Sequence, residues 1–232
     1  MLVAIISDIH SNYDAMQAVL ADAESHCVQL YIFCGDMLGY YYQPNECIDA
    51  LINTNHVAIK GNHDQMFIDL LDNGKDSNEY RKKYGSSLEI AKSVISKEKE
   101  LWIKNLPEHA SVNLDGFRVG IYHGSPSSID EYLYRDTIIE KHGWLKQLDF
   151  DLICFGHTHH PFVLEVEGKK ILNPGSVGQP RNRQPGAHWA LLDTLTHKIT
   201  PMISSYDSSH IINECLRRDP DVSYLHKVLV RT

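Results

Sequence analysis

Three of the four residues that follow Gly156 are histidines, in the stretch GHTHH at 156–160. Residues two apart on an extended segment point the same way, so His157 and His159 can present both imidazoles to one ligand. Imidazole is the commonest metal-ligating side chain. The apolar run DLICF precedes this stretch and predicts a buried strand. The pattern therefore indicates a metal site just past a strand.

The same arrangement recurs after other apolar runs. Polar side chains that can bind metal follow the predicted strands at 2–6, 30–34 and 56–61 and a hairpin strand; they are Asp8, His10, Asp36, Asn62 and His123. Taken singly, DxH, GD and GNHD are also ordinary caps and turns. In open α/β sheets, however, the ligand crevice lies beyond the carboxyl ends of the strands. We therefore expect these dispersed side chains to converge at one sheet edge.

The seven side chains comprise two carboxylates, four imidazoles and one amide. A zinc-like ion takes about four ligands, so this set suits two ions that share a carboxylate. Mixed imidazole and carboxylate ligands favour Mn, Fe, Ni or Zn over Ca or Mg. Two such ions, roughly 3.5–4 Å apart, activate a water and clamp a phosphoryl group. The residues thus predict a dinuclear centre whose surplus positive charge attracts phosphate.

The elements that must position these residues alternate along the first half of the chain. Strand-like runs at 2–6, 30–34 and 56–61 enclose helical patterns at 13–24 and 44–54. This βαβαβ order predicts parallel strands joined by helical crossovers.

The second half gives different patterns. Residues 72–86 are polar and loop-like, and a helix is expected over 86–105, with Ser86 and Glu89 spaced as a capping box. Turn dipeptides at 115–116 and 167–168 predict hairpins. A further strand pair is expected between the stretches HWALLD and THKIT, and residues 137–148 are expected to form a helix. Residues 208–232 give no clear pattern. A parallel half and a mostly antiparallel half suggest two sheets packed face to face in a single α/β domain over 1–232.

Composition and charge restrict the partners. The chain has 232 residues, of which 43% are hydrophobic and 22% charged, and its formal net charge is −8. The acidic balance argues against bulk nucleic acid and anionic membranes as main partners. No stretch approaches the roughly 20 apolar residues of a membrane helix, and the N-terminus reads as a core strand. The five cysteines include no CxxC pair, so we expect reduced thiols and a cytoplasmic location.

The pattern D-x-H, G-D, G-N-H-[DE], H, G-H-x-H resembles that of the calcineurin-like metallophosphoesterases. The likeness runs from residue 1 to about 193 and includes the stretch LNPGSVGQPRN at 172–182. It points to a prokaryotic, phosphodiesterase-like branch of that superfamily. The resemblance implies a four-layer α/β/β/α sandwich.

The resemblance also implies roles for the site residues. Asp8, His10 and His159 would hold one ion, and Asn62, His123 and His157 the other, with Asp36 as the bridge. His63 would contact the phosphate and protonate the leaving group. The implied activity is hydrolysis of a small phosphate ester, preferably a diester, by a metal-bridging hydroxide. Manganese is the favoured metal.

Some features depart from the family or stay open. The protein phosphatases of this superfamily extend G-D to G-D-x-x-D-R-G, but here GDMLGYY places Gly39 and Tyr40 at the Asp and Arg positions. This weakens the alternative of a protein phosphatase, while a phosphomonoesterase of the same superfamily stays open as an alternative. Arg181 or Arg183 could contact the phosphate instead. The tyrosines at 40–42 could form a wall for an aromatic leaving group or pack a loop.

Two further alternatives fit the sequence less well. A non-catalytic metal-binding scaffold of the same fold would typically have lost ligands, and none is lost here. A mononuclear amidohydrolase-like site would have HxH on the first strand, where this chain has DxH. Residues at about 65–110 could form a cap-like insertion that covers the site or a dimer face, so a homo-oligomer is compatible with the sequence.

Overall fold

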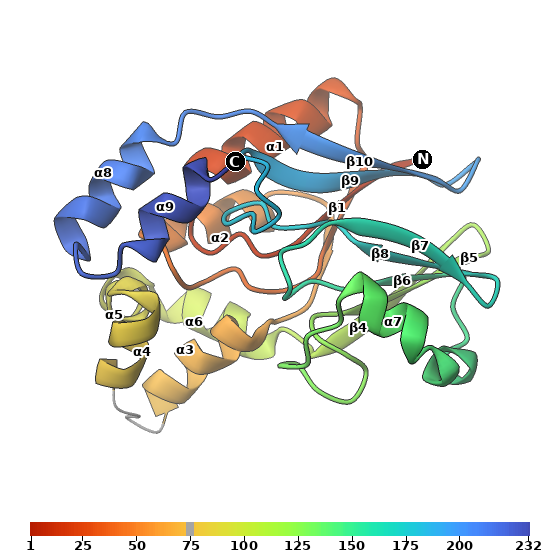
Figure 1. Cartoon of the computed structure of the whole chain (residues 1–232), viewed down its shortest axis with the longest axis horizontal. Helices are drawn as coiled ribbons and strands as arrows, with labels where there is room; N and C mark the ends of the chain where they lie inside the picture. Colours follow the sequence, from red (N-terminus) through yellow and green to blue (C-terminus); the bar gives the residue numbers. More distant parts are fainter. Residues whose placement is uncertain (73–76) are drawn as a thin grey trace.

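The computed structural model describes residues 1–72 and 77–232. Within these ranges the strands form two five-stranded sheets (Figure 1). The first has the order β10-β9-β1-β2-β3 and comprises β1 (Leu2–Ile6), β2 (Leu30–Phe33), β3 (His56–Ala58), β9 (Ala187–Asp193) and β10 (Lys198–Ser204). The second has the order β4-β5-β6-β8-β7 and comprises β4 (His109–Leu114), β5 (Phe117–Tyr122), β6 (Leu152–Cys154), β7 (Phe162–Val166) and β8 (Lys169–Asn173).

The helices fall into three groups along the chain. Two are the crossovers of the first sheet, α1 (Tyr13–Ser25) and α2 (Pro44–Ile52). Four follow β3, namely α3 (Asn62–Asp72), α4 (Ser77–Tyr84), α5 (Ser87–Val94) and α6 (Lys97–Asn105). The others are α7 (Arg135–Glu140), a 3₁₀ turn (Gly143–Gln147), α8 (Ser209–Arg218) and α9 (Tyr224–Val230).

The side-chain alternation of β1 sets the layers. Ala4 and Ile6 pack with residues of α1 and α2, whereas Val3 and Ile5 point the other way and pack with β5 and β6 of the second sheet. The far side of the second sheet, through Ile153, packs on α7 and the 3₁₀ turn. The predicted four-layer α/β/β/α sandwich is confirmed.

The division of the chain between the sheets differs from the expected split into halves. β9 pairs antiparallel with β1, with Leu2 opposite Asp193, so the last hairpin completes the first sheet. In the second sheet, β5-β6 and β6-β8 are parallel while the two outer pairs are antiparallel. Both sheets are therefore mixed.

The predicted helix over 86–105 is wrong as a single element. It breaks into α5 and α6 at residues 95–96, and Ser96 caps α6 by accepting from the Lys99 amide at 3.4 Å. The Ser86 hydroxyl makes no cap and instead donates to Asp219 at 2.8 Å. The predicted helix over 137–148 is likewise interrupted, at residues 141–142.

The polar segment 72–86 contains α4, so reading it as a loop was wrong where it is described; residues 73–76 lie outside the described ranges. Tyr80 and Tyr84 lie four apart on α4 and pack with the tyrosines at 40–42. The unclear C-terminal part forms α8 and α9, which join the same cluster. No helix in the described ranges is long and apolar enough to cross a membrane.

Candidate metal centre

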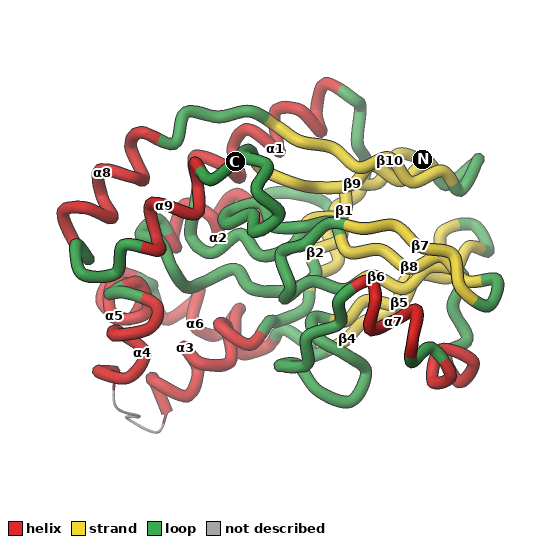
Figure 2. Tube along the Cα trace, viewed as in Figure 1, coloured by secondary structure: helices red, strands yellow, loops and turns green. Residues whose placement is uncertain are grey.

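The predicted ligands converge, but the strand ends that carry them belong to two sheets. β1, β2 and β3 supply Asp8, His10, Asp36 and Asn62 from the first sheet, while β5 and β6 of the second lead to His123, His157 and His159. The expectation of a single sheet edge is corrected in this respect. In Figure 2 loops gather between the strands and the helices α3–α6, α8 and α9. The exposed fraction of these seven residues is 7% or less.

Asp8, His10 and His159 form one buried cluster, whose ligand atoms lie within 4.8 Å of one another. Asp8 Oδ1 lies 3.3 Å from His159 Nε2 and 3.8 Å from His10 Nε2. The Asp8 carboxylate also accepts from the backbone amide of His157, at 3.1 and 3.2 Å. That bond fixes the carboxylate against the second sheet.

Asp36, His123 and His157 form a second buried cluster on the same criterion. Asp36 Oδ2 lies 3.3 Å from His123 Nε2, and His123 Nε2 lies 3.0 Å from Asn62 Oδ1. His123 Nδ1 faces the Cys34 carbonyl at 2.8 Å, so Nε2 is the ring nitrogen directed at Asp36 and Asn62. His157 is reversed, because its Nε2 faces the Asp130 carbonyl at 3.1 Å, so Nδ1 is its available nitrogen.

Asp36 lies between the two clusters. Its Oδ1 accepts from the His63 amide at 2.8 Å, but its Oδ2 is buried and has no hydrogen-bond partner. The same Oδ2 lies 3.7 Å from His10 Nε2 and 3.3 Å from His123 Nε2. A buried carboxylate oxygen without a donor is costly unless a cation compensates it. The donor set therefore fits two metal ions that share Asp36.

The backbone at this site is strained. Five of the candidate ligands have left-handed φ angles near +60°, which are uncommon outside glycine: Asp8, His10, Asp36, His157 and His159. Such conformations persist only where the surroundings enforce them, and they concentrate at functional sites.

Two glycines allow the loops to approach this closely. A Cβ at Gly61 would lie 2.1 Å from Asp36 Oδ1. A Cβ at Gly39, where φ is +96°, would lie 2.4 Å from His63 Nδ1. A larger residue at either position would displace a site side chain.

The electrostatics of the protein groups favour anionic carboxylates. Burial alone would raise the pKa of Asp8, but His159 more than compensates and holds it below its usual range. The pKa of Asp36 is likewise low, because His123 and His63 outweigh the effect of burial. Burial tends to lower the pKa of His123, yet Asp36 raises it to about 9. The protein therefore presents two ionised carboxylates to whatever cation fills the centre.

His63 lies beside both clusters and forms a third group with His10 and Asp36. Its ring contacts both Tyr40 and Tyr84, with each centroid 4.7 Å away. Its Nδ1 is buried without a partner, and burial lowers its pKa to about 4.

Asp64 does not support His63. Its carboxylate accepts from the backbone amides of four residues, Asp36, Met37, Leu38 and Gly61, at 2.9–3.2 Å. Asp64 is thus a clamp that joins the loops after β2 and β3. No hydrogen bond joins its carboxylate to His63 among the described residues.

A cleft of about 280 Å³ opens over the clusters and is lined by Asp36, Asn62, His63, His157, His159 and Arg181 together with several tyrosines. Arg181 donates to Tyr40 Oη at 3.0 Å and to Gln179 Oε1 at 3.3 Å, and it forms no ion pair with any described residue. Arg183 is exposed.

Of the tyrosine run at 40–42, Tyr40 lines the cleft. Tyr41 and Tyr42 instead donate to the C-terminal segment, at Leu225 O and Asp219 Oδ2. Four lining residues were missed from the sequence: Lys83, Tyr84, Tyr132 and Tyr224. The Tyr80–Tyr84 spacing was a usable signal for α4, whereas Tyr224 carried no signal.

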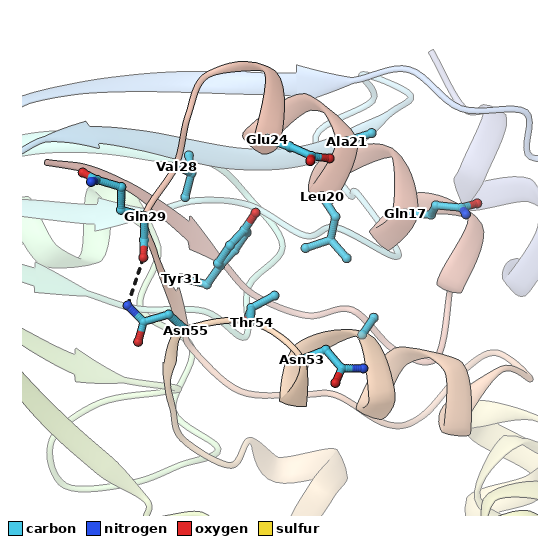
Figure 3. Close-up of a pocket in the computed structure, with 11 residues that line it drawn as sticks. Gln17, Leu20, Ala21, Glu24, Val28, Gln29, Tyr31, Asn53, Thr54 and Asn55 are labelled. Atoms are coloured by element: carbon cyan, nitrogen blue, oxygen red, sulfur yellow. Dashed lines mark hydrogen bonds between the residues drawn. The ribbon is translucent and has the colours of Figure 1, made fainter.

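A second and larger hollow lies between α1 and the β2 and α2 region (Figure 3). It measures about 580 Å³ and is lined by apolar and amide side chains around Tyr31, with Glu24 as its one carboxylate. No candidate metal cluster of the described residues lies there. The candidate metal-binding residues lie at the smaller cleft and not at this hollow.

Comparisons with known proteins agree with this geometry. The sequence profile of the calcineurin-like phosphoesterase superfamily domain matches residues 1–197. The chain is 34% identical over 224 residues to an uncharacterized protein of Methanocaldococcus jannaschii, MJ0912, covering 89% of this chain and 88% of that protein. Phosphodiesterase MJ0936 of the same organism is 23% identical over 175 residues, 75% of this chain and 83% of its own. The crystal structure of a metallophosphoesterase from Sphaerobacter thermophilus superposes with a TM-score of 0.79 at 28% identity, covering 100% and 99% of the two chains.

Proposed function

Because the chain belongs to the calcineurin-like phosphoesterase superfamily, we propose that it is a dinuclear metal-dependent phosphoesterase that hydrolyses a small phosphodiester. The observation that carries the proposal is the buried, unpartnered Oδ2 of Asp36 between two His-rich clusters. The name of the relative MJ0936, a phosphodiesterase, supports the choice of a diester.

The residues would share the metals as follows. Asp8, His10 and His159 would hold one ion, Asn62, His123 and His157 the other, and Asp36 both. When bound, two divalent ions lower the pKa of a water and neutralise charge on the phosphoryl oxygens. Manganese is our preferred metal, and Fe, Ni and Zn also suit these donors.

His63 is the proposed general acid. Its Nδ1 is buried beside Gly39, so Nε2 is the nitrogen available to a substrate. An anionic phosphate in the cleft would raise the low pKa of His63, and a protonated imidazole can then supply the proton that the leaving group needs. Tyr40 and Tyr84 both contact the ring and restrict its movement.

Arg181 is the proposed phosphate contact. It is half-buried, held by Tyr40, and without an acidic partner among the described residues, so its charge is available to an anion. The cleft volume of about 280 Å³ lies at the low end of ligand pockets, which favours a small phosphorylated substrate. Lys83 and Tyr84 of α4 also line the cleft, which supports a covering role for the predicted insertion at about 65–110.

The test is turnover of bis(4-nitrophenyl) phosphate by the purified protein with and without Mn²⁺. We expect Mn-dependent hydrolysis that falls by at least about 100-fold in His63→Ala, with the bound metal unchanged. His210→Ala, an exposed histidine paired with Asp14, is the matched control and should keep full activity. A metal-loaded protein that is inert toward every phosphoester tried would refute the proposal.

A further inference from the structure

We infer, on the basis of the proposed function, that the substrate carries an aromatic ring, phenol- or nucleobase-like, held at the cleft mouth by Tyr132 and Tyr224. Four tyrosines line the cleft, but they do so in two ways. Tyr40 and Tyr84 are buried against His63, with exposed fractions of 6% and 9%. Tyr132 and Tyr224 are exposed by 47% and 39%. The outer pair is therefore free to meet a ligand.

Tyr132 is fixed next to the metal centre. Its ring centroid lies 4.0 Å from that of the candidate ligand His157. The ring of Tyr134 stacks on Tyr132, with a centroid distance of 6.0 Å and an interplanar angle of 12°. A tyrosine ring held in this way gives contact area at a low entropy cost. Tyr132 lines the same cleft as the candidate ligands Asp36, His157 and His159, so the organic group of a phosphate bound there would lie in the cleft that this ring lines.

Tyr224 is supplied by a segment outside the range matched to the family, residues 1–197. It is the first residue of α9, and the next residue, Leu225, accepts the Tyr41 hydroxyl at 3.0 Å. Near the end of the chain, Arg231 donates to the Arg181 carbonyl at 2.9 Å. The C-terminal segment thus places the exposed ring of Tyr224 in the cleft. Through Arg231 it also holds the backbone of Arg181, the arginine that lines the cleft.

The charges around the outer pair fit the same ligand. Arg181 and Lys83 line the cleft and form no ion pair with a described residue, so they favour an anion near the rings. A compact phosphoester of an aromatic alcohol presents a phosphate to the cations and a flat apolar face to the tyrosines. Contact with a ligand ring would also remove exposed tyrosine surface from water.

Phosphonates test the inference without turnover, because they have no leaving group. We would titrate the Mn-loaded protein calorimetrically with phenyl-, cyclohexyl- and methylphosphonate at a pH where all three are dianions. Phenylphosphonate should bind about tenfold more tightly than methylphosphonate, the order expected for one stacked ring, and more tightly than cyclohexylphosphonate of similar size. In the double variant Tyr132→Ala/Tyr224→Ala both preferences should vanish, and in the matching double Phe variant they should persist.

The controls are Ile139→Ala and Val230→Ala, exposed apolar residues of α7 and α9 that do not line the cleft; both should keep the phenyl preference. Metal content and thermal unfolding of the double variant check that His157 still binds. Equal affinities for phenyl- and cyclohexylphosphonate in the wild type, or an undiminished phenyl preference in the double Ala variant, would overturn the inference. Binding is measured independently of hydrolysis, so an inert enzyme would refute the proposed function and leave this result standing.

Discussion

The Nε2 atoms of His10 and His159 face each other at 3.1 Å across 149 residues of sequence. Each ring uses its other nitrogen for a backbone carbonyl, His10 Nδ1 at 2.9 Å from Leu38 O and His159 Nδ1 at 2.7 Å from Gln179 O. A carbonyl can only accept, so both Nδ1 atoms carry the hydrogen and the two Nε2 lone pairs oppose each other. Such a pair needs a cation between or beside the nitrogens, and Asp8 next to them is the matching anion.

We therefore predict that metal removal destabilises the protein. A ligand present at about 100 times its Kd contributes about 2.7 kcal/mol, so EDTA should lower Tm by about 5–10 °C for a chain of this size. Added Mn²⁺ should restore Tm, and acidification from about pH 8 to about pH 5 should also expel the metal, because imidazole ligands must be neutral. Differential scanning fluorimetry with elemental analysis measures both. An unchanged Tm in EDTA, with no metal found before treatment, would show that no ion fills this site.

Asp8→Asn and Asp36→Asn should differ in metal stoichiometry. Asp8 belongs to one cluster, whereas Asp36 Oδ2 approaches histidines of both. We expect Asp8→Asn to retain about one ion per chain and Asp36→Asn to lose both, with an affinity loss of more than about 100-fold. Competition with a chelating dye gives the affinities. If the two variants lost the same single ion, Asp36 would not be shared.

Much of this centre could be predicted because its residues follow strands directly. Once β1, β2 and β6 were recognised as buried runs, Asp8, Asp36 and His157 had to lie at strand ends. The sequence predicted two facing sheets but not how the chain divides between them, since the pairing of β9 with β1 is set by contacts nearly 190 residues apart. The predicted capping box at Ser86 was also wrong, because the Ser86 hydroxyl donates to Asp219, which lies 133 residues further along the chain.

The outer part of the cleft was the least predictable. Tyr84 comes from a helix whose polar composition reads as a loop, and Tyr224 comes from a segment with no motif. Tyr84 packs in one cluster with Tyr40, Tyr41 and Tyr42, and α9, the helix that begins with Tyr224, joins this cluster through Leu225, Val228 and Leu229. The candidate metal ligands could be predicted because they directly follow strands, whereas the residues that line the cleft wall depend on how distant helices pack.

Gly39→Ala should impair catalysis without removing the metals. A Cβ there would lie 2.4 Å from His63 Nδ1, and φ is +96°. Gly116→Ala is the matched control, because φ is +97° but no atom lies within 4 Å of the added Cβ. Both variants should lose about 1–2 kcal/mol of stability from backbone strain, and Gly39→Ala alone should lower kcat. Equal kcat in the two variants would mean that the position of His63 does not matter.

Asp219 should hold the C-terminal helices to the cleft. Its buried carboxylate accepts from the Ser86 amide, the Ser86 hydroxyl and the Tyr42 hydroxyl at 2.8–3.0 Å. Asp219→Ala leaves a buried amide and two hydroxyls without their acceptor, which costs about 2–4 kcal/mol in unfolding free energy. Because the loss is local, hydrogen exchange should accelerate in α8 and α9 while β1 and β2 stay protected. KM for an aryl phosphodiester should rise more than kcat falls, since α9 carries Tyr224 and not the metal ligands. Glu140→Ala, which removes an exposed carboxylate of α7 away from the C-terminal helices, should change neither their exchange nor KM. Uniform acceleration across both sheets would mean that Asp219 supports the whole fold and not this segment.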